Sequence, residues 1–345
     1  MDIEFHYYIT YLIAARAGFS TNDALVLAHS CQYTDDNNLV FSIDKGRPSE
    51  YHNYISQTMN ITKPRHDLLR IYPLFHFIPG DPAAPTAMRK DGKLHRLNTT
   101  PDNTNANKII DDAIKTRNLY RIGIACHSYA DTFAHQNFVG YYDGYNSMKG
   151  MLEQRLPEVG HAEAMHKPDW PGLIWEDTRL VSSISRIANK DRFKRASGRI
   201  YQKLRFYNKP DISDQDIKSE IQFLLNDIEE AIGSPDYDNK LKPDRIKRYK
   251  ELSLKQQYGG KLLDDFDEEI WLKDAVGNSI SDFRFKMDEL LSDIISFNEE
   301  LNWKDKDHYK ETHWYNFQEA VKAHQNNAWE ILDKSVFSEL ELEKL

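Results

Sequence analysis

The chain has 345 residues, of which 40% are hydrophobic and 29% charged, and its formal net charge is −9. This composition is ordinary for a soluble globular protein, and the negative charge argues against a protein that coats nucleic acid. The two cysteines, Cys31 and Cys126, lie inside apolar helical patterns, which argues against a disulfide framework and is typical of a reducing compartment. No secretory leader or membrane-spanning stretch is apparent, so we expect a cytoplasmic protein, although a protein exported without a leader would look the same.

Helical periodicity dominates the chain, glycine and proline are sparse, and strand-like alternation is scarce, so we expect an all-α fold. The first helix is predicted over residues 3–17. Ser20 and Asp23 form a capping box that predicts the start of a second helix over residues 22–33, followed by a turn that contains Asp35 and Asp36. Further helices are expected over 105–116, over 119–140, from Trp175 onward and over 311–333. One domain is predicted over 1–205, with a helical region over 206–345 packed on it.

The central predicted helix carries His127, Asp131 and His135 at intervals of four residues, which places them on one face. Asp131 is the only formally charged residue between Arg121 and Asp143. A buried, isolated carboxylate costs several kcal/mol unless a cation neutralises it, and histidine is the residue that most often accompanies a metal ion. Because the three side chains span about 12 Å of helix, two or more ions with Asp131 between them fit better than one. The simpler alternative is a buried hydrogen-bond cluster.

Other potential ligands and acids occur elsewhere in the chain. They are His6, Asp35, Asp36, His76, His161, Glu163, His166 and Asp169. Paired acids at a helix end are by default solvated turn residues, and a histidine among aromatic residues, such as His76 between Phe75 and Phe77, is more often part of the core than a ligand.

The central helix, with its Asp-x2-Ala-His-Gln core, resembles that of the zinc-dependent phospholipase C superfamily, which also contains the fungal single-strand-specific nucleases. The chain is more similar still to an uncharacterised bacterial family that shares this core, the Phe-His-Tyr-Tyr opening and the Phe-His-Phe element. The resemblance covers roughly residues 3–180. It implies a multi-helix, phospholipase-C-like bundle around a cluster of two or three zinc ions, and the hydrolysis of a phosphate ester.

By position, the resemblance implies metal ligands at His6, His76, His127, Asp131, His135 and His161, with Asp131 bridging two ions. It gives Asp35 or Asp36 the role of orienting or deprotonating the attacking water. The family's last ligand is expected four residues after His161, where this chain has Met165. Glu163, His166 or Asp169 must replace it, and we favour Asp169. The family's third zinc binds the backbone of a processed N-terminal residue, whereas this sequence begins Met1-Asp2, so a two-ion site stays open.

The resemblance implies a phosphate-ester substrate, lipid or nucleotide among the candidates, attacked by zinc-bound hydroxide. We expect no stable nucleic-acid complex. Residues 186–209 carry nine Lys or Arg against one acid. The simplest interpretation of this segment is a solvated helix. The functional alternative is a patch that steers anions or makes a peripheral membrane contact.

Two other functions stay open. The adjacent pair His66-Asp67, with His29 before it and Asp131 after it, follows the order of the His-Asp metal phosphohydrolases, but that assignment leaves His127 and His135 unused. The second alternative is a non-enzymatic helical module whose basic segment 186–209 and acidic segment 251–300 contact partners while its histidines are structural.

Overall fold

The computed structural model describes residues 1–58, 68–148, 160–277 and 301–340. The protein is mainly helical, with 55% helix and 7% strand, which confirms the expected fold class at that level. The described α-helices are α1 (Thr10–Ala17), α2 (Thr21–Asp36), α4 (Tyr72–Phe75), α5 (Thr104–Lys115), α6 (Leu119–Ala134), α7 (Asn189–Asn208), α8 (Asp214–Ile232), α9 (Lys242–Ser253), α10 (Ile270–Ala275) and α12 (His313–Leu332). Three short antiparallel pairs of strands join β1 (Ser42–Ile43) to β2 (Tyr51–His52), β3 (Ile174–Glu176) to β4 (Arg186–Ala188) and β5 (Val276–Gly277) to β6 (Asn302–Trp303). Among these described helices, none has the length and apolar content needed to cross a membrane.

The N-terminal segment begins with a π-helix, Glu4–Ile9, which passes directly into α1. The sequence predicts a single helix here, and the wider π-helical turn is the detail that periodicity misses. The helix ends as predicted at Gly18, whose φ of 104° lies in the left-handed region that favours glycine. The π-helical turn carries His6, and π-helical turns occur frequently at functional sites.

Helix α2 starts at the predicted capping box and extends further than predicted. Ser20 caps it, because its hydroxyl oxygen accepts a hydrogen bond of 3.1 Å from the amide of Asp23. The helix continues to Asp36, so Asp35 belongs to its last turn rather than to a loop after it. The helix therefore sets the direction of the Asp35 side chain.

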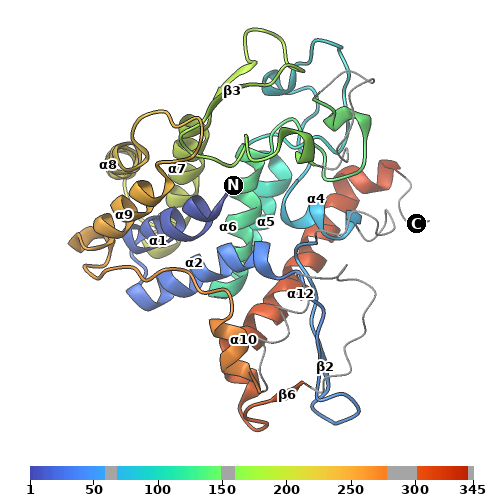
Figure 1. Ribbon diagram of the computed structural model, residues 1–345, viewed down its shortest axis with the longest axis vertical. Coiled ribbons are helices and arrows are strands. Elements are labelled where there is room, and N and C mark those ends of the chain that lie inside the picture. Colours follow the sequence, from blue (N-terminus) through green and yellow to red (C-terminus); the bar gives the residue numbers. More distant parts are fainter. Residues whose placement is uncertain (59–67, 149–159, 278–300, 341–345) are drawn as a thin grey trace.

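Helix α6 is central to the fold and contacts α2, α5, α7 and α12, and the N-terminus lies beside it (Figure 1). Its contact with α2 is close at Gly123, where an added Cβ would lie 2.4 Å from the carbonyl oxygen of Leu27. The sequence predicts a helix as far as Gly140, but α6 ends at Ala134. The chain turns at Asn137, which has a φ of 72° and donates its amide to the carbonyl of Thr99 at 2.9 Å.

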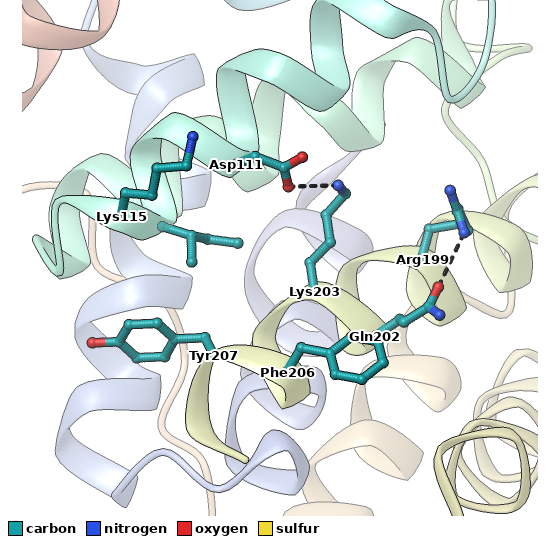
Figure 2. Close-up of a pocket in the computed structure, with 8 residues that line it drawn as sticks. Asp111, Lys115, Arg199, Gln202, Lys203, Phe206 and Tyr207 are labelled. Atoms are coloured by element: carbon teal, nitrogen blue, oxygen red, sulfur yellow. Dashed lines mark hydrogen bonds and ion pairs between the residues drawn. The ribbon is translucent and has the colours of Figure 1, made fainter. Parts of the chain in front are cut away.

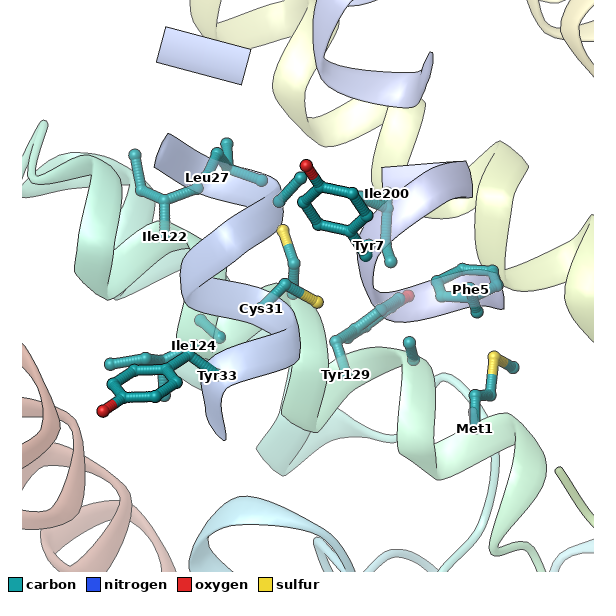
Figure 3. Close-up of a cluster of buried hydrophobic side chains, with 14 of the residues drawn as sticks. Met1, Phe5, Tyr7, Leu27, Cys31, Tyr33, Ile122, Ile124, Tyr129 and Ile200 are labelled. Carbon is teal, nitrogen blue, oxygen red and sulfur yellow. The ribbon is translucent and has the colours of Figure 1, made fainter. Parts of the chain in front are cut away.

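A hydrophobic core packs the N-terminal helices against α6 and α7 (Figure 3). Phe5, Leu27, Ile122 and Ile200 are fully buried in it. Burying one such side chain contributes roughly 1.5–3 kcal/mol. The same cluster includes Trp314 of α12, so the core joins residues from both sides of the predicted boundary near residue 205, and that boundary stays a prediction.

The prediction that a helix begins at Trp175 is wrong. Residues 174–176 form β3, in which Trp175 is paired with Ile187 of β4, and the next helix, α7, begins only at Asn189. The mixture of polar residues after Trp175 is similar to the first turn of a helix. A cross-strand pair of buried apolar side chains, Trp175 and Ile187, favours the strand instead.

Candidate metal centre

The structure brings eight of the predicted site residues together around the C-terminal half of α6. His127, Asp131 and His135 come from α6 and its end, His6 from the π-helix, Asp35 from α2, His76 from the end of α4, and His161 and Asp169 from the segment before β3. Three groups of potential ligand atoms, each lying within 4.8 Å of one another, could hold a metal ion. The groups are His6, Cys31 and His127; Asp35, His76 and His127; and His135, His161 and Asp169.

One ring nitrogen of each of four histidines contacts a backbone carbonyl. The distances are 2.8 Å from His127 Nδ1 to Cys31, 2.8 Å from His135 Nδ1 to His76, 2.9 Å from His76 Nε2 to Ser56, and 2.9 Å from His161 Nδ1 to Met165. A carbonyl oxygen only accepts, so each of these nitrogens carries the hydrogen, and in the neutral ring the other nitrogen keeps a lone pair. Metal-binding histidines are oriented in this way in proteins.

The remaining nitrogens of two of these rings face each other. His76 Nδ1 lies 3.0 Å from His127 Nε2, and Asp131 Oδ2 lies 3.3 Å from the first atom and 3.2 Å from the second. In neutral rings, two lone pairs and a carboxylate at this distance repel one another. The arrangement therefore requires a cation, either a proton or a metal ion.

Asp131 lies at the centre of the cluster and is 1% exposed. Its Oδ1 lies 3.2 Å from His6 Nε2, while its Oδ2 faces His76 and His127. Burial by itself would raise the pKa of Asp131, but His135, the N-terminal amine, His127 and His6 hold that pKa well below its usual range. The carboxylate is therefore ionised, and its two oxygens face different sets of ligands, as in a bridging ligand.

The backbone amine of Met1 also lies in the cluster. It contacts Asp131 and lies 3.5 Å from Asp169 Oδ1. Burial alone would lower the pKa of this amine, but the carboxylates of Asp131, Asp169 and Asp35 raise it to about 11. The N-terminal backbone thus lies among the candidate ligands and links the two acids.

His6 is held in a form that can bind a metal. Burial and the neighbouring His127 lower its pKa to about 3, so its ring is neutral at pH 7, the state that binding to a metal requires. Its Nε2 is buried and makes no hydrogen bond within the described residues, and the same is true of Asp169 Oδ1. Buried polar atoms without a hydrogen-bond partner are rare, and both of these face potential metal ligands.

The structure distinguishes Asp35 from Asp36, the two candidates for the acid that acts on the attacking water. The side chain of Asp35 is 28% exposed, and its Oδ1 lies 3.7 Å from His76 Nδ1 and 3.6 Å from His127 Nε2. Asp36 belongs to none of the three groups and accepts a hydrogen bond of 3.0 Å from Gln32. Asp36 faces a neighbouring cavity of about 430 Å³. Asp35 is thus the acid that reaches both the cluster and solvent.

Of the three candidates for the last ligand, Asp169 is the one that the structure places beside His161, with 3.6 Å between Asp169 Oδ2 and His161 Nε2. His166 instead stacks on Trp170, with 5.6 Å between the ring centroids. The side chain of Glu163 lies outside the described residues.

The structure describes only some of the residues that the His-Asp alternative requires. His66 and Asp67 lie outside the described residues. His29, which that alternative also needs, packs against the ring of Trp271, with 3.9 Å between centroids, and is in none of the described ligand groups.

Sequence analysis missed Cys31, whose Sγ lies 3.6 Å from His6 Nδ1. Burial raises the pKa of this thiol, so the neutral form is favoured. A signal was present, because Cys31 precedes Asp35 by four residues and the two share one face of α2, as His127 and Asp131 do on α6.

A second surface cavity, of about 450 Å³, lies between α5 and α7 (Figure 2). Its acid, Asp111, forms an ion pair of 2.7 Å with Lys203, and Arg199 bonds to Gln202 at 3.0 Å. None of its described lining residues is a histidine or a cysteine. This cavity therefore shares no described residue with the candidate metal centre and differs from it in chemistry.

Comparison with curated proteins and with solved structures finds no match. A family model described as a family of unknown function (DUF6765) matches residues 1–332. Because this match includes both the ligand cluster and most of the C-terminal helices, the chain belongs to the family of unknown function DUF6765.

Proposed function

We propose that this protein is a metal-dependent hydrolase of phosphate esters, built as a phospholipase-C-like bundle around two or three zinc ions. The observation that carries the proposal is the approach of His76 Nδ1 to His127 Nε2 at 3.0 Å beside Asp131. A single proton would relieve the repulsion between these two rings. It would not account for the further donors of His135, His161 and Asp169 in the adjoining group.

The donor set favours zinc. Imidazole nitrogens and carboxylate oxygens predominate, a combination that suits zinc better than magnesium or calcium, which prefer oxygen ligands alone. The first two groups share His127, and Asp131 lies between them and His135. This arrangement supports neighbouring ions that share Asp131 rather than one isolated ion.

The chain's own residues supply the remaining parts of a hydrolytic site. Zinc lowers the pKa of a bound water to about 7 and stabilises negative charge on phosphate oxygens. Asp35, partly exposed at the edge of the cluster, would orient the attacking water or accept its proton. Asp131 is fully enclosed, so its role is to hold charge in the centre rather than to exchange protons with solvent.

The substrate class is proposed from the resemblance alone, with phospholipids and nucleotides as candidates. The basic segment 186–209 offers limited support for anion steering. Lys194, Arg199, Lys203 and Arg205 form ion pairs with acids, and Arg192 is buried. A peripheral membrane contact through this segment stays a prediction.

The test is hydrolysis by zinc-loaded protein of three probes: bis(p-nitrophenyl) phosphate, phosphatidylcholine vesicles and a single-stranded oligonucleotide. We expect turnover of at least one probe, with loss of that activity in His127→Ala. The matched control is His29→Gln, a buried histidine outside the ligand groups, which should keep the activity. Failure of the zinc-loaded protein on every probe, or an unchanged rate in His127→Ala, would contradict the proposal.

A further inference from the structure

Helix α9, from the C-terminal part of the chain, contacts the π-helix that carries His6, and it lies beside the N-terminal helices in Figure 1. The contact centres on Arg245, whose side chain is fully buried. Its guanidinium makes a two-pronged ion pair with Glu4, with 2.8 Å from Nε to Oε2 and 2.9 Å from Nη2 to Oε1. Glu4 is also fully buried and lies two residues before His6.

The same guanidinium reaches the loop that carries Asp169. Arg245 Nη1 donates to Asp236 Oδ2 at 2.7 Å, and the amide of Asp236 donates to the carbonyl of Gly172 at 2.8 Å. At Gly172 an added Cβ would lie 3.0 Å from the Cβ of Asp236. Arg245 therefore connects two segments that each carry a candidate metal ligand, one with His6 and one with Asp169.

A second cation of α9 extends this connection. Lys242 Nζ lies 3.0 Å from Asp2 Oδ2, and the carbonyl of Asp2 accepts the amides of Phe5 at 2.9 Å and His6 at 3.1 Å. The pair is partly exposed, with side-chain exposures of 32% and 15%. Lys242 thus fixes the start of the turn in which His6 lies.

A buried ion pair is a weak source of stability, because the loss of hydration offsets most of the attraction. Its geometry is nevertheless specific, since the planar guanidinium fixes a carboxylate in both distance and angle. A network that joins Glu4 to Asp236 across the chain is therefore suited to orientation. The segments that it orients are those that carry ligands of the candidate metal centre.

We propose that Arg245 is a positioning residue of the candidate metal centre, with Glu4 and Asp236 as its ion-pair partners and with the Lys242–Asp2 pair acting beside it. The inference rests on the proposed metal binding. It gives the C-terminal region a role in the candidate site. Helix α9 holds the segment of His6 and the loop of Asp169 in fixed positions relative to α6. Arg245 itself touches no candidate metal ligand among the contacts described.

The test compares Arg245→Met with Arg205→Met in the full-length chain. Arg205 is the matched control, because it makes the same two-pronged pair with Glu220, at 2.8 and 3.0 Å, away from the ligand groups. Zinc affinity is measured by competition with a chromophoric chelator, and ligand geometry by the visible spectrum of the Co²⁺-loaded protein. We expect Arg245→Met to lose about tenfold or more in zinc affinity and to change the cobalt spectrum, while Arg205→Met changes neither.

A second, milder variant keeps the test decisive if Arg245→Met does not fold. Lys242→Met removes a partly exposed pair and should weaken zinc binding in the same direction by a smaller factor. If folded Arg245→Met, or Lys242→Met where the former does not fold, binds zinc with the affinity and spectrum of Arg205→Met, the positioning role is wrong and the metal centre stands. If the wild-type chain binds no metal, the proposed function fails, and the inference fails with it.

Discussion

The rings of His76 and His127 face each other through nitrogens that carry no hydrogen in the neutral state, with 3.0 Å between Nδ1 of the first and Nε2 of the second. The reason lies on the far side of each ring, where the carbonyls of Ser56 and Cys31 accept the one N–H hydrogen that each neutral ring carries. An arrangement that directs lone pairs toward each other stores repulsion unless a cation is bound. The candidate metal centre follows from this pair.

The two neighbouring acids should differ in their effect on catalysis. Asp35→Asn removes a carboxylate that reaches both the cluster and solvent, so we expect the hydrolytic rate to fall by about 10²-fold or more. Asp36→Asn alters a side chain bonded to Gln32 outside the ligand groups and should leave the rate within a few-fold. Rates of the two variants on the best probe substrate decide this, and equal losses would argue against a special role for Asp35.

Histidine substitutions should separate the two metal-site hypotheses. His76→Gln removes a central candidate ligand, so we expect less bound metal. His29→Gln removes a ring packed on Trp271, so the metal content should be unchanged. The His-Asp alternative predicts loss of metal in His29→Gln. Elemental mass spectrometry on both folded variants gives the answer.

The close contact between α2 and α6 should tolerate no side chain at Gly123. In Gly123→Ala the new Cβ would meet the carbonyl of Leu27 at 2.4 Å and the Cβ of Ser30 at 2.6 Å, so one helix must move. We expect a loss of about 2 kcal/mol in the free energy of unfolding and weaker metal binding, because α2 carries Asp35.

Gly198→Ala, in the middle of α7, is the control for this substitution. Its Cβ would make only ordinary contacts, the nearest at 3.4 Å, so the gain in helix propensity should raise the free energy of unfolding by about 0.5–1 kcal/mol. Urea denaturation of both variants measures the difference. A Gly123→Ala protein as stable as the wild type would contradict the close packing.

Because of Asp177, we expect the free energy of unfolding to depend on pH. Burial alone would raise its pKa, but hydrogen bonds from the Arg179 side chain, at 2.9 and 2.7 Å, lower the pKa below its usual value. The unfolded chain therefore takes up a proton at a higher pH than the folded one does. The stabilisation is complete above about pH 4 and is lost as the pH falls through the lower pKa of the folded state.

Asp177→Asn should accordingly lower the free energy of unfolding by about 2 kcal/mol at pH 7. The difference from the wild type should shrink at pH 3, below the usual pKa of an aspartate, because the unfolded wild-type chain takes up its proton before the folded one does. Urea denaturation at the two pH values tests this, and a difference that does not depend on pH would rule out the assigned ion pair.

Sequence reasoning reached those parts of the site that depend on a single element. His127, Asp131 and His135 share a face because one helix spaces them, and the capping box located the start of α2. The end of α6 and the strand at Trp175 were missed, since both depend on pairing with distant segments: Asn137 with Thr99, and Trp175 with Ile187. Local periodicity carries no information about such partners.

The contacts between distant segments could not be predicted from the sequence, for the same reason. Glu4 and Arg245 are separated by 241 residues, and neither has a pattern around it that indicates the other. The place of the Met1 amine between Asp131 and Asp169 likewise depends on contacts between the start of the chain and residues far along it. Cys31 could have been noticed from its spacing to Asp35, although a buried cysteine in a helix is most simply a core residue.

If the converging lone pairs of His76 and His127 bind metal, the metal content of the purified protein shows it most directly. The measurement is elemental mass spectrometry on protein purified without a chelator or a His-tag column, beside Asp131→Ala prepared in the same way. We predict two or more zinc ions per wild-type chain, mostly lost in the variant. Wild-type protein that is folded and carries no metal would contradict the account and leave the residues around Asp131 as a buried hydrogen-bond network.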